Sequence, residues 1–395
     1  MRKGWEYKKL GDCFSYIKNG ANIKQKKDAD GFPITRIETL SGGVFNRDRM
    51  GYAGIHDLSK YADYVLESKD LLMSHINSKT YIGRTVEYKR NNEETIIHGM
   101  NLLRLKAIHE LIDSTFFAYY TQSGDFKSKI ARIRKDAVNQ SSFAISDLKR
   151  FDIPLPPKST QLAIVSELDK INELIRLKKE QLKDFDNLAQ SLFYEMFGDP
   201  VENEKGWEVK KLGDISSIGT GSTPNRKNKD FYKNGTYPWV KSTEVCNLPI
   251  YSVEEYITEE ALKNSNCTLY PPNTILMAMY GQGKTRGQIG LLKIEACTNQ
   301  AVAAIMPTKE VVDEIFLSQH LMLMYEHIRN MARGGNQANL NLSIVKSIQI
   351  FLPPLSLQRL FAQRIEQIER EKSEVQKSIQ DLETLLASRM QYWFE

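Results

Sequence analysis

Cysteine is scarce in this sequence, and a long apolar run is missing. The four cysteines, at positions 13, 246, 267 and 297, form no C-x-x-C pair and have no histidine at metal-ligand spacing. This pattern argues against a disulfide framework or a structural zinc site and favours a reducing cytoplasm. No apolar run of about 18 residues could span a membrane, and no signal-peptide pattern opens the chain. We therefore expect a cytoplasmic protein with no membrane association.

A strong net charge and recognisable catalytic motifs are missing too. The formal net charge of +5 permits nucleic-acid binding without requiring it, because a local patch matters more than the total. Neither H-E-x-x-H nor G-x-S-x-G occurs. His320 and His327 lie on a predicted helix over residues 314–333, but no carboxylate or cysteine completes a metal site. We therefore expect no catalytic residue, no metal ligand and no cofactor bound by this chain.

The sequence does contain an internal repeat. GWEYKKLGD at residues 4–12 returns as GWEVKKLGD at residues 206–214, with one mismatch in nine. Residues 140–161 return at residues 337–358 with nine of 22 positions identical, including a Pro-Pro pair in each copy. Between these borders the copies diverge. A chain of 395 residues written twice predicts two domains of one fold, each of roughly 200 residues.

One copy contains a near match to a nucleotide-binding loop. Residues 278–285 read A-x-x-x-x-G-K-T, with alanine in place of the first glycine. A phosphate-binding loop needs a helix after it, whereas the alternating apolar residues after Gly287 indicate a strand. Aligning the two copies places Ser78-Lys79-Thr80 opposite Gly283-Lys284-Thr285, so the first copy lacks the glycines. A nucleotide-binding site is therefore the weaker interpretation of this segment.

A long helical pattern follows each Pro-Pro pair. Seam positions recur at a mean spacing of 3.5 residues with Lys and Glu between them, which is typical of a coiled coil. Lys178, Lys372 and Arg389 also occupy seam positions, from which their side chains can extend outward. Two amphipathic helices on separate cores are the alternative. The apolar seam consists of Ile164, Leu168, Ile171, Ile175, Leu182, Phe185 and Leu192 in the first copy, and of Phe361, Ile365, Ile368, Val375, Ile379, Leu382 and Leu386 in the second.

The equivalence of the two helices predicts the architecture. Two equivalent units that pair suggest a pseudo-two-fold axis, and an axis across the helices makes them antiparallel. We expect an α+β fold in which two mixed α/β globular domains are joined by two long antiparallel coiled-coil helices, as a rod with a head at each end. The predicted parts are a first globular domain (1–157), a central helix (158–198), a second globular domain (199–354) and a C-terminal helix (355–395).

Polar loops with cationic and amide side chains occupy matching places in both copies. One pair is residues 74–85 and 280–288, and the other, at residues 129–140 and 329–341, follows a predicted helix in each copy (114–134 in the first). Arg and Lys suit phosphates and guanine, while Asn and Gln can pair with adenine. A solvated surface is the plain alternative for any single loop. Matching places with different contents favour two surfaces that recognise two different targets.

These features resemble the specificity subunits of type I restriction–modification systems. The resemblance rests on GWEVKKLGD, TGSTPNRKNKDFYKNGTYPWVKSTEV, LMAMYGQGKTRG, CTNQAVAAIMP, GGNQANLNLSIVKSIQIFLPPLSLQ and LAQSLFYEMFGDP, and it covers essentially the full chain. It implies that each head is a target recognition domain reading one half of a bipartite, asymmetric site in double-stranded DNA. It also implies that the helices dock two methyltransferase subunits, and that restriction subunits can join. S-adenosylmethionine, Mg and ATP are then expected on the partner subunits.

Residues in and around the polar loops are the candidates for phosphate and base contacts. A predicted helix over residues 164–196 would be about 50 Å long, or about 14 base pairs, and one duplex turn is about 10 base pairs. We therefore expect half-site centres roughly 10 to 14 base pairs apart. The candidates are Lys79, Arg84, Arg132, Arg134, Lys135, Asn139 and Gln140 in the first domain, and Ser222, Thr223, Lys241, Tyr280, Gln282, Lys284, Arg286, Arg333, Asn336 and Gln337 in the second.

Two functions of other classes stay open on the sequence alone. The first is a nucleotide-binding enzyme built on residues 278–285. The second is an interaction scaffold, in which a coiled-coil rod presents heads that bind protein. A DNA adenine methyltransferase encoded beside this chain would favour DNA recognition over both.

Overall fold

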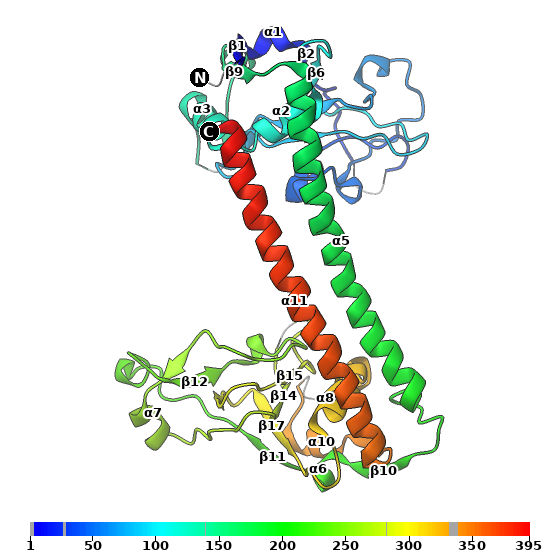
Figure 1. Ribbon diagram of the computed structural model, residues 1–395, viewed down its shortest axis with the longest axis vertical. Helices are drawn as coiled ribbons and strands as arrows, with labels where there is room; N and C mark the ends of the chain where they lie inside the picture. The colour runs from blue at the N-terminus through cyan, green and yellow to red at the C-terminus, as the bar shows by residue number, and fades with distance from the viewer. Residues whose placement is uncertain (1–3, 27–28, 139, 282, 332–338) are drawn as a thin grey trace. The chain divides into compact units, whose positions relative to one another are not determined.

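The computed structural model describes residues 4–26, 29–138, 140–281, 283–331 and 339–395. The chain divides into two compact units: unit 1 is residues 1–178 with 378–395, and unit 2 is residues 179–377. Two long helices, α5 (Lys158–Phe197) and α11 (Leu355–Phe394), each contribute residues to both units (Figure 1). The four-part division expected from the sequence stays a prediction.

Each unit is built on the same four-stranded antiparallel sheet. The strand order is β2-β6-β3-β5 in unit 1 and β11-β17-β14-β15 in unit 2. The repeat seen in the sequence is therefore a repeat of fold, even where the residues diverge. The strands are β2 (Phe14–Asn19), β3 (Leu71–Ser74), β5 (Thr85–Glu87) and β6 (Leu102–Ala107), and their counterparts are β11 (Ser216–Thr220), β14 (Ile275–Ala278), β15 (Ile289–Leu291) and β17 (Val302–Pro307).

The two repeated border segments meet as a pair of strands in each unit. Glu6 lies opposite Leu155 in unit 1, and Glu208 lies opposite Leu352 in unit 2, so the antiparallel register is the same in both. The borders repeat in sequence because they close each unit around its core. The elements are β1 (Glu6–Lys9), α1 (Leu10–Cys13), α4 (Ile145–Lys149) and β9 (Asp152–Leu155), with counterparts β10 (Glu208–Lys211), α6 (Leu212–Ile215), α10 (Leu342–Ser347) and β18 (Gln349–Leu352).

Smaller elements flank the main sheets. A three-stranded sheet β4-β8-β7 belongs to unit 1, and a sheet β13-β12-β16 belongs to unit 2. Their bounds are β4 (Ile76–Asn77), β7 (Lys135–Asp136), β8 (Ser141–Ser142), β12 (Tyr237–Val240), β13 (Tyr256–Ile257) and β16 (Cys297–Thr298), with helix α7 (Glu259–Lys263) and 3-10 turns η1 (Ile37–Gly43), η2 (Arg47–Arg49), η3 (Ala62–Tyr64), η4 (Lys229–Phe231) and η5 (Ser242–Glu244).

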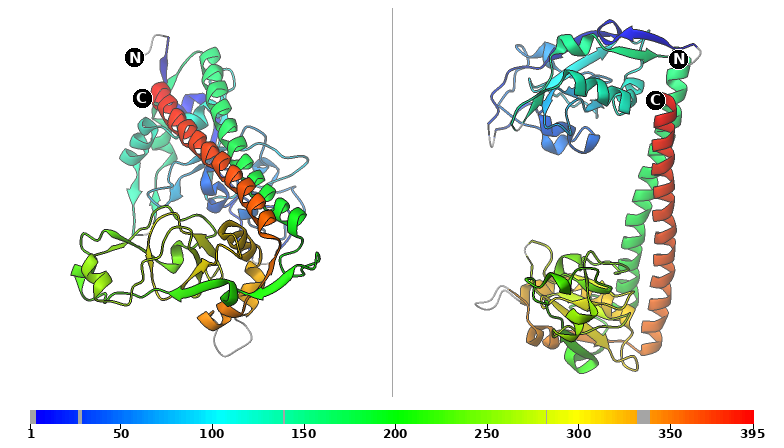
Figure 2. Two further views of the ribbon diagram at one scale, coloured as in Figure 1. Left: turned by 60° about the horizontal axis from the view of Figure 1, so that its bottom comes forward. Right: turned by 90° about the vertical axis from the view of Figure 1, so that its left-hand side faces the viewer.

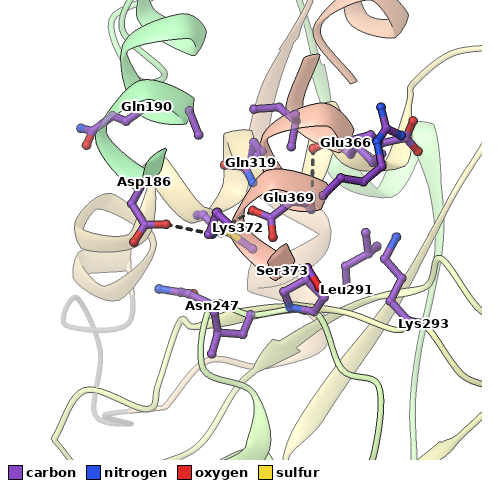
Figure 3. A pocket seen from close by; sticks show the side chains of 18 of the residues that line it. Asp186, Gln190, Asn247, Leu291, Lys293, Gln319, Glu366, Glu369, Lys372 and Ser373 are labelled. Carbon is purple, nitrogen blue, oxygen red and sulfur yellow. Dashed lines mark hydrogen bonds and ion pairs between the residues drawn. The ribbon is translucent and has the colours of Figure 1, made fainter. Parts of the chain in front are cut away.

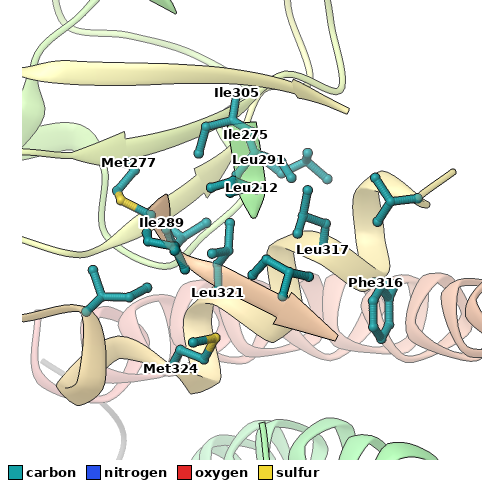
Figure 4. Packing of buried hydrophobic residues seen from close by; sticks show 14 of the residues in the cluster. Leu212, Ile275, Met277, Ile289, Leu291, Ile305, Phe316, Leu317, Leu321 and Met324 are labelled. Atoms are coloured by element: carbon teal, nitrogen blue, oxygen red, sulfur yellow. The ribbon is translucent and has the colours of Figure 1, made fainter. Parts of the chain in front are cut away.

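The main sheet of unit 2 is buried on both faces. Ile275 and Met277 of β14 pack in one apolar cluster with helix α8 (Glu314–Leu323), as Figure 4 shows. Leu276 and Ala278 of the same strand belong to a second cluster. Alternate side chains of a strand point to opposite faces, so a strand covered on both sides reads as a continuous apolar run. This explains why β14 reads as a continuous apolar run.

The helix expected over residues 114–134, and its counterpart over 314–333, are each broken, so the prediction of single helices was wrong. Unit 1 has α2 (Ser114–Tyr120) and α3 (Gly124–Ile133), because the Ser123 hydroxyl caps a new helix by accepting from the Phe126 amide at 3.2 Å. Unit 2 has α8 and then α9 (Tyr325–Met331). His320 is buried in α8, where its Nε2 donates to the Pro200 carbonyl at 2.9 Å.

A buried glutamine ties each long helix to its unit. Gln161 accepts from the Asp113 amide at 2.8 Å and donates to the Leu111 and Pro156 carbonyls, both at 2.9 Å. Gln358 repeats this arrangement: it accepts from the Asp313 amide at 2.9 Å and donates to the Pro353 carbonyl at 2.8 Å. Both glutamines are fully buried. Each one joins the start of a long helix to the start of α2 or α8.

Within unit 2 the two long helices run antiparallel. Asp186 of α5 lies 2.9 Å from Lys372 Nζ, while Phe193 and Phe197, further along α5, pack on Phe361, which is earlier in α11. Partner numbers fall in α11 as they rise in α5, which fixes the direction. Lys372 therefore turns to a carboxylate of α5 instead of extending into solvent as expected.

Unit 1 contains the other paired segments of the same helices, which can be followed in Figure 2. Glu167 of α5 accepts from Trp393 Nε1 of α11 at 3.0 Å and also binds the Arg389 guanidinium. Phe394 packs on Phe116 of α2, with ring centroids 5.6 Å apart. Every predicted apolar seam residue is buried or half-buried. Ile164 and Leu168 lie in the apolar cluster of unit 1, and Phe361 lies in that of unit 2, so the assignment of these residues to a coiled-coil seam stays a prediction.

Substituting the buried glutamine should destabilise unit 2. Gln358→Met keeps the volume but leaves the Asp313 amide and the Pro353 carbonyl without their partner, which should lower the free energy of unfolding by about 2–5 kcal/mol. Urea unfolding measures the change. Gln363→Met, at an exposed position on the same helix, is the matched control. Equal unfolding curves for the two variants would contradict this role.

Candidate nucleic-acid interface

The first candidate loops connect equivalent strands. Residues 75–84 join β3 to β5, and residues 279–288 join β14 to β15. The β3–β5 and β14–β15 pairs have the same register, and the loops that join them have the same length. Lys79 therefore corresponds to Gly283, and Arg84 corresponds to Gln288. The sequence alignment, which matched Lys79 with Lys284, was wrong by one residue. A polar loop has no periodic pattern of apolar residues that could fix its alignment, so the pairing of the flanking strands has to fix it.

The near match to a phosphate-binding loop is a connection between strands. β14 ends at Ala278 and β15 begins at Ile289, so a strand follows Gly283-Lys284-Thr285 where a phosphate-binding loop needs a helix. The helix N-terminus that would bind the nucleotide phosphates is therefore missing. The strand expected after Gly287 is confirmed, while the absence of a nucleotide site stays a prediction.

In unit 1 the structure brings the two candidate loops together. β4, from the first loop, pairs with β8, and β8 pairs with β7 from the second loop. Lys79 Nζ lies 3.1 Å from the Asp136 carboxylate, and Arg134 Nε lies 2.8 Å from it. The Ser141 hydroxyl, followed by Lys79, lowers the pKa of Asp136 to about 2. Asp136 therefore stays ionised and holds both cationic side chains in place.

These side chains line a cleft of about 430 Å³, which we call the cationic cleft. Its cationic residues are Lys79, Arg84, Lys127 and Arg134, and Thr80, Thr85, Thr121 and Gln122 add hydroxyl and amide groups. The Arg84 guanidinium lies 4.5 Å from the Tyr81 ring centroid, which orients it. Clustered guanidinium and ammonium groups beside hydroxyls are suited to bind phosphate oxygens.

Lys127 is a cleft residue that the sequence reasoning missed. It lies in α3, two turns before Arg134, so a helical count from Arg134 would have found it. The other candidates of unit 1 do not line the cleft. Arg132, Lys135 and Gln140 are exposed outside it, and Asn139 lies outside the described residues.

In unit 2 the loop candidates differ in exposure. Lys284 is exposed, Tyr280 is 39% exposed, and Arg286 is half-buried. Gln282, Arg333, Asn336 and Gln337 lie outside the described residues. Lys284 and Tyr280 are therefore the described loop residues most available to a DNA duplex.

The remaining candidates of unit 2 are already engaged. The Thr223 hydroxyl donates to the Gln300 side chain, and the half-buried Ser222 donates its amide to the Thr298 carbonyl at 3.0 Å. Lys241 Nζ binds Glu254 at 2.7 Å and Glu255 at 3.2 Å, and the Glu254 hydrogen bond in particular raises the pKa of Lys241. A phosphate would have to compete with two carboxylates for this ammonium group.

Arg226 is a cationic residue of unit 2 that was not among the candidates from the sequence. Its guanidinium lies 4.5 Å from the Tyr232 ring centroid and 4.7 Å from that of Trp239, and it pairs with Glu255 at 2.6 Å. The aromatic partners precede β12 and lie within it, so no local pattern in the sequence marks them.

A groove of about 690 Å³ in unit 2 has a different character. It lies between α5, α8, α11 and the loop at Asn247, and it contains the Asp186–Lys372–Glu369 ion pairs, both 2.9 Å long (Figure 3). Both charge signs line it, so it is not a phosphate site like the cationic cleft. In the described part of the chain, no cluster of three potential metal ligands occurs, and no helix is long and apolar enough to cross a membrane.

Comparison with known proteins identifies the family of this chain. The family model described as the type I restriction modification DNA specificity domain matches residues 2–184 and again residues 204–384. The chain belongs to the type I restriction–modification DNA specificity family. Members of this family provide DNA target recognition and are not themselves the catalyst.

Individual specificity subunits are similar along nearly the whole chain. The MjaX type I restriction enzyme specificity subunit of Methanocaldococcus jannaschii is 29% identical, covering 97% of this chain and 92% of the relative. A solved chain from a study of complex assembly and conformational transition of the type I system has a TM-score of 0.62 at 17% identity, covering 100% of this chain and 98% of that one. The S subunit from M. genitalium has a TM-score of 0.58 at 15% identity, covering 98% and 95%. The two structures support the fold.

Neutralising the cationic cleft of this specificity subunit should weaken DNA binding without sequence preference. Lys79→Ala and Arg134→Ala should each lower affinity for every duplex and reduce the slope of log K against log salt by about 0.9 per lost phosphate contact. Titrations of the assembled complex at several salt concentrations measure this. Lys60→Ala, at an exposed site outside the cleft, is the control. An unchanged slope in both cleft variants would show that the cleft does not bind DNA.

Proposed function

We propose that this specificity subunit reads a bipartite, gapped and asymmetric DNA target, with one half-site for each unit. The observation that carries this is one fold built twice with different loop chemistry. The sheets share a strand order, yet Lys79 and Arg84 of one loop correspond to Gly283 and Gln288 of the other. Loops of different composition on equivalent supports suit two different half-sites.

The gap between the half-sites would be set by the long helices. α5 and α11 are continuous helices of 40 residues that contribute to both units. We expect half-site centres roughly 10 to 14 base pairs apart, with both recognition surfaces on one face of the duplex. Lengthening both helices by the same number of turns should widen the gap and leave the half-sites unchanged.

The partners would be two DNA methyltransferase subunits docked along the helices, joined by ATP-driven restriction subunits where the system has them. S-adenosylmethionine, Mg and ATP would be bound by those partners and not by this chain. The cytoplasm, which holds the DNA and these small molecules, is the expected location.

The docking surface would use leucines that face away from the seam. Leu174 and Leu177 of α5 are 48% and 47% exposed, and their spacing of three places them on one side of the helix. Exposed leucines on a helix whose seam is already buried suit contact with another protein.

The map of methylated adenines across the host genome tests the function directly. Deleting this gene should remove methylation at one gapped, two-part motif and at no other. A continuous palindrome would contradict the bipartite reading. An unchanged map would mean that the chain directs no methyltransferase and would favour the scaffold function.

Placing charges on the exposed apolar surface at Leu174 and Leu177 should prevent docking of the methyltransferase subunit. The double variant Leu174→Glu with Leu177→Glu places two charges on this surface and should abolish co-purification with the methyltransferase subunit, while the unfolding curve stays close to that of the parent. Lys170→Glu, exposed on the same helix, is the control. Full complex formation by the double variant would place the docking surface elsewhere.

A further inference from the structure

Side chains of helix α9 bind backbone carbonyls of the loop between β14 and β15. Arg329 Nη2 donates to the Gly283 carbonyl at 2.9 Å, and Arg329 Nη1 donates to the Arg286 carbonyl at 3.2 Å. The Tyr325 hydroxyl donates to the Lys284 carbonyl at 2.5 Å. Three of the loop's carbonyls are therefore bound by two side chains one helical turn apart.

The two side chains also fix each other. Arg329 Nη1 donates to Tyr325 Oη at 2.6 Å, and the guanidinium lies 5.1 Å from the tyrosine ring centroid. The tyrosine oxygen thus accepts from the arginine while its hydrogen goes to the loop. Linked hydrogen bonds of this kind polarise one another, and the planar guanidinium loses little freedom for each bond it forms.

The loop is fitted closely to this clasp. Gly283 has φ +61° and Gly287 has φ +88°, which a residue with a side chain rarely adopts. A Cβ at Gly287 would lie 3.1 Å from Arg329 Cγ. Gly287, which follows the near match to a phosphate-binding loop, is therefore the glycine that allows the loop backbone to approach α9, whereas a Cβ at Gly283 would meet no atom within 4 Å.

Among the described residues of unit 1, the corresponding side chains do not form an equivalent clasp. Counted from the helix caps Asp113 and Asp313, Tyr325 corresponds to Asp125 and Arg329 to Lys129. Lys129 binds Asp125 and donates to Tyr120 Oη at 3.0 Å, so this pair closes on its own helices. The arrangement around Arg329 is therefore particular to the second unit.

We propose that Arg329, supported by Tyr325, is a positioning residue for one half-site of the DNA target. It holds the loop at residues 280–288 in the conformation that contacts DNA before DNA binds. The conformational entropy of the loop is therefore lost during folding and not during binding. The clasped Lys284 carbonyl belongs to the exposed lysine of the loop, and Tyr280 lies four residues before it. This inference rests on the proposed function, because it assigns a role within the same recognition surface.

The test uses the assembled methyltransferase complex and three duplexes: the mapped target, and the target with one or the other half-site replaced. The half-site that the loop reads is identified first. It is the half-site at which the double variant Tyr280→Ala with Lys284→Ala loses sequence discrimination. Arg329→Lys keeps the charge but loses the two-armed contact, so discrimination at that half-site should fall about tenfold or more. Discrimination at the other half-site should be unchanged, and Tyr325→Phe should show a smaller loss at the same half-site.

Lys129→Met, at the corresponding position of unit 1, is the matched control and should leave both half-sites discriminated. A merely structural role for Arg329 would lower the unfolding midpoint and weaken binding to all three duplexes alike, which would overturn the proposal. Retained discrimination in Arg329→Lys would overturn it as well. If Arg329→Lys does not fold, Tyr325→Phe decides by the same comparison. Failure of the parent complex to distinguish the three duplexes would instead refute the proposed function.

Discussion

The structure depends on a buried glutamine used twice. Gln161 and Gln358 each bind the amide of the residue that caps a domain helix and a carbonyl two residues before a long helix, and both side chains are fully buried. An unpaired polar group there would be costly, so the helix start and the domain helix must stay together. Since the main sheet packs on that domain helix, the loops at the strand ends keep a defined relation to the long helix of their own unit.

Stability and recognition are carried by different parts of each unit. The sheet, the border strands and the domain helices form apolar clusters that are similar in both copies. The loops between β3 and β5, and between β14 and β15, add little to these clusters and differ freely in composition. A core buried on both faces of the sheet tolerates this variation, because loop side chains on the surface contribute little to folding.

Charge is used locally and not as a net excess. With a net charge of only +5, the chain gathers cations in the cationic cleft and holds Lys79 and Arg134 with the single carboxylate of Asp136. A phosphate can replace one side of such an exposed pair at small cost, because water screens surface ion pairs and leaves them weak. Lys241 is different, since two carboxylates compete for it. Asp136 thus holds two cationic side chains of the cleft at defined positions.

The sequence by itself determined the duplication, the two long helices, and the strand after Gly283-Lys284-Thr285, because repeats and periodicity are local properties of a chain. Tertiary structure alone decided which loop residues correspond, where the domain helices break, and that β4 meets β8 to form the cationic cleft. It also placed Lys127 in the cationic cleft and Arg226 against Tyr232, and it brought Arg329 to the carbonyls of a loop more than forty residues earlier. These depend on contacts between segments far apart in sequence, and such contacts leave no periodic signal in either segment.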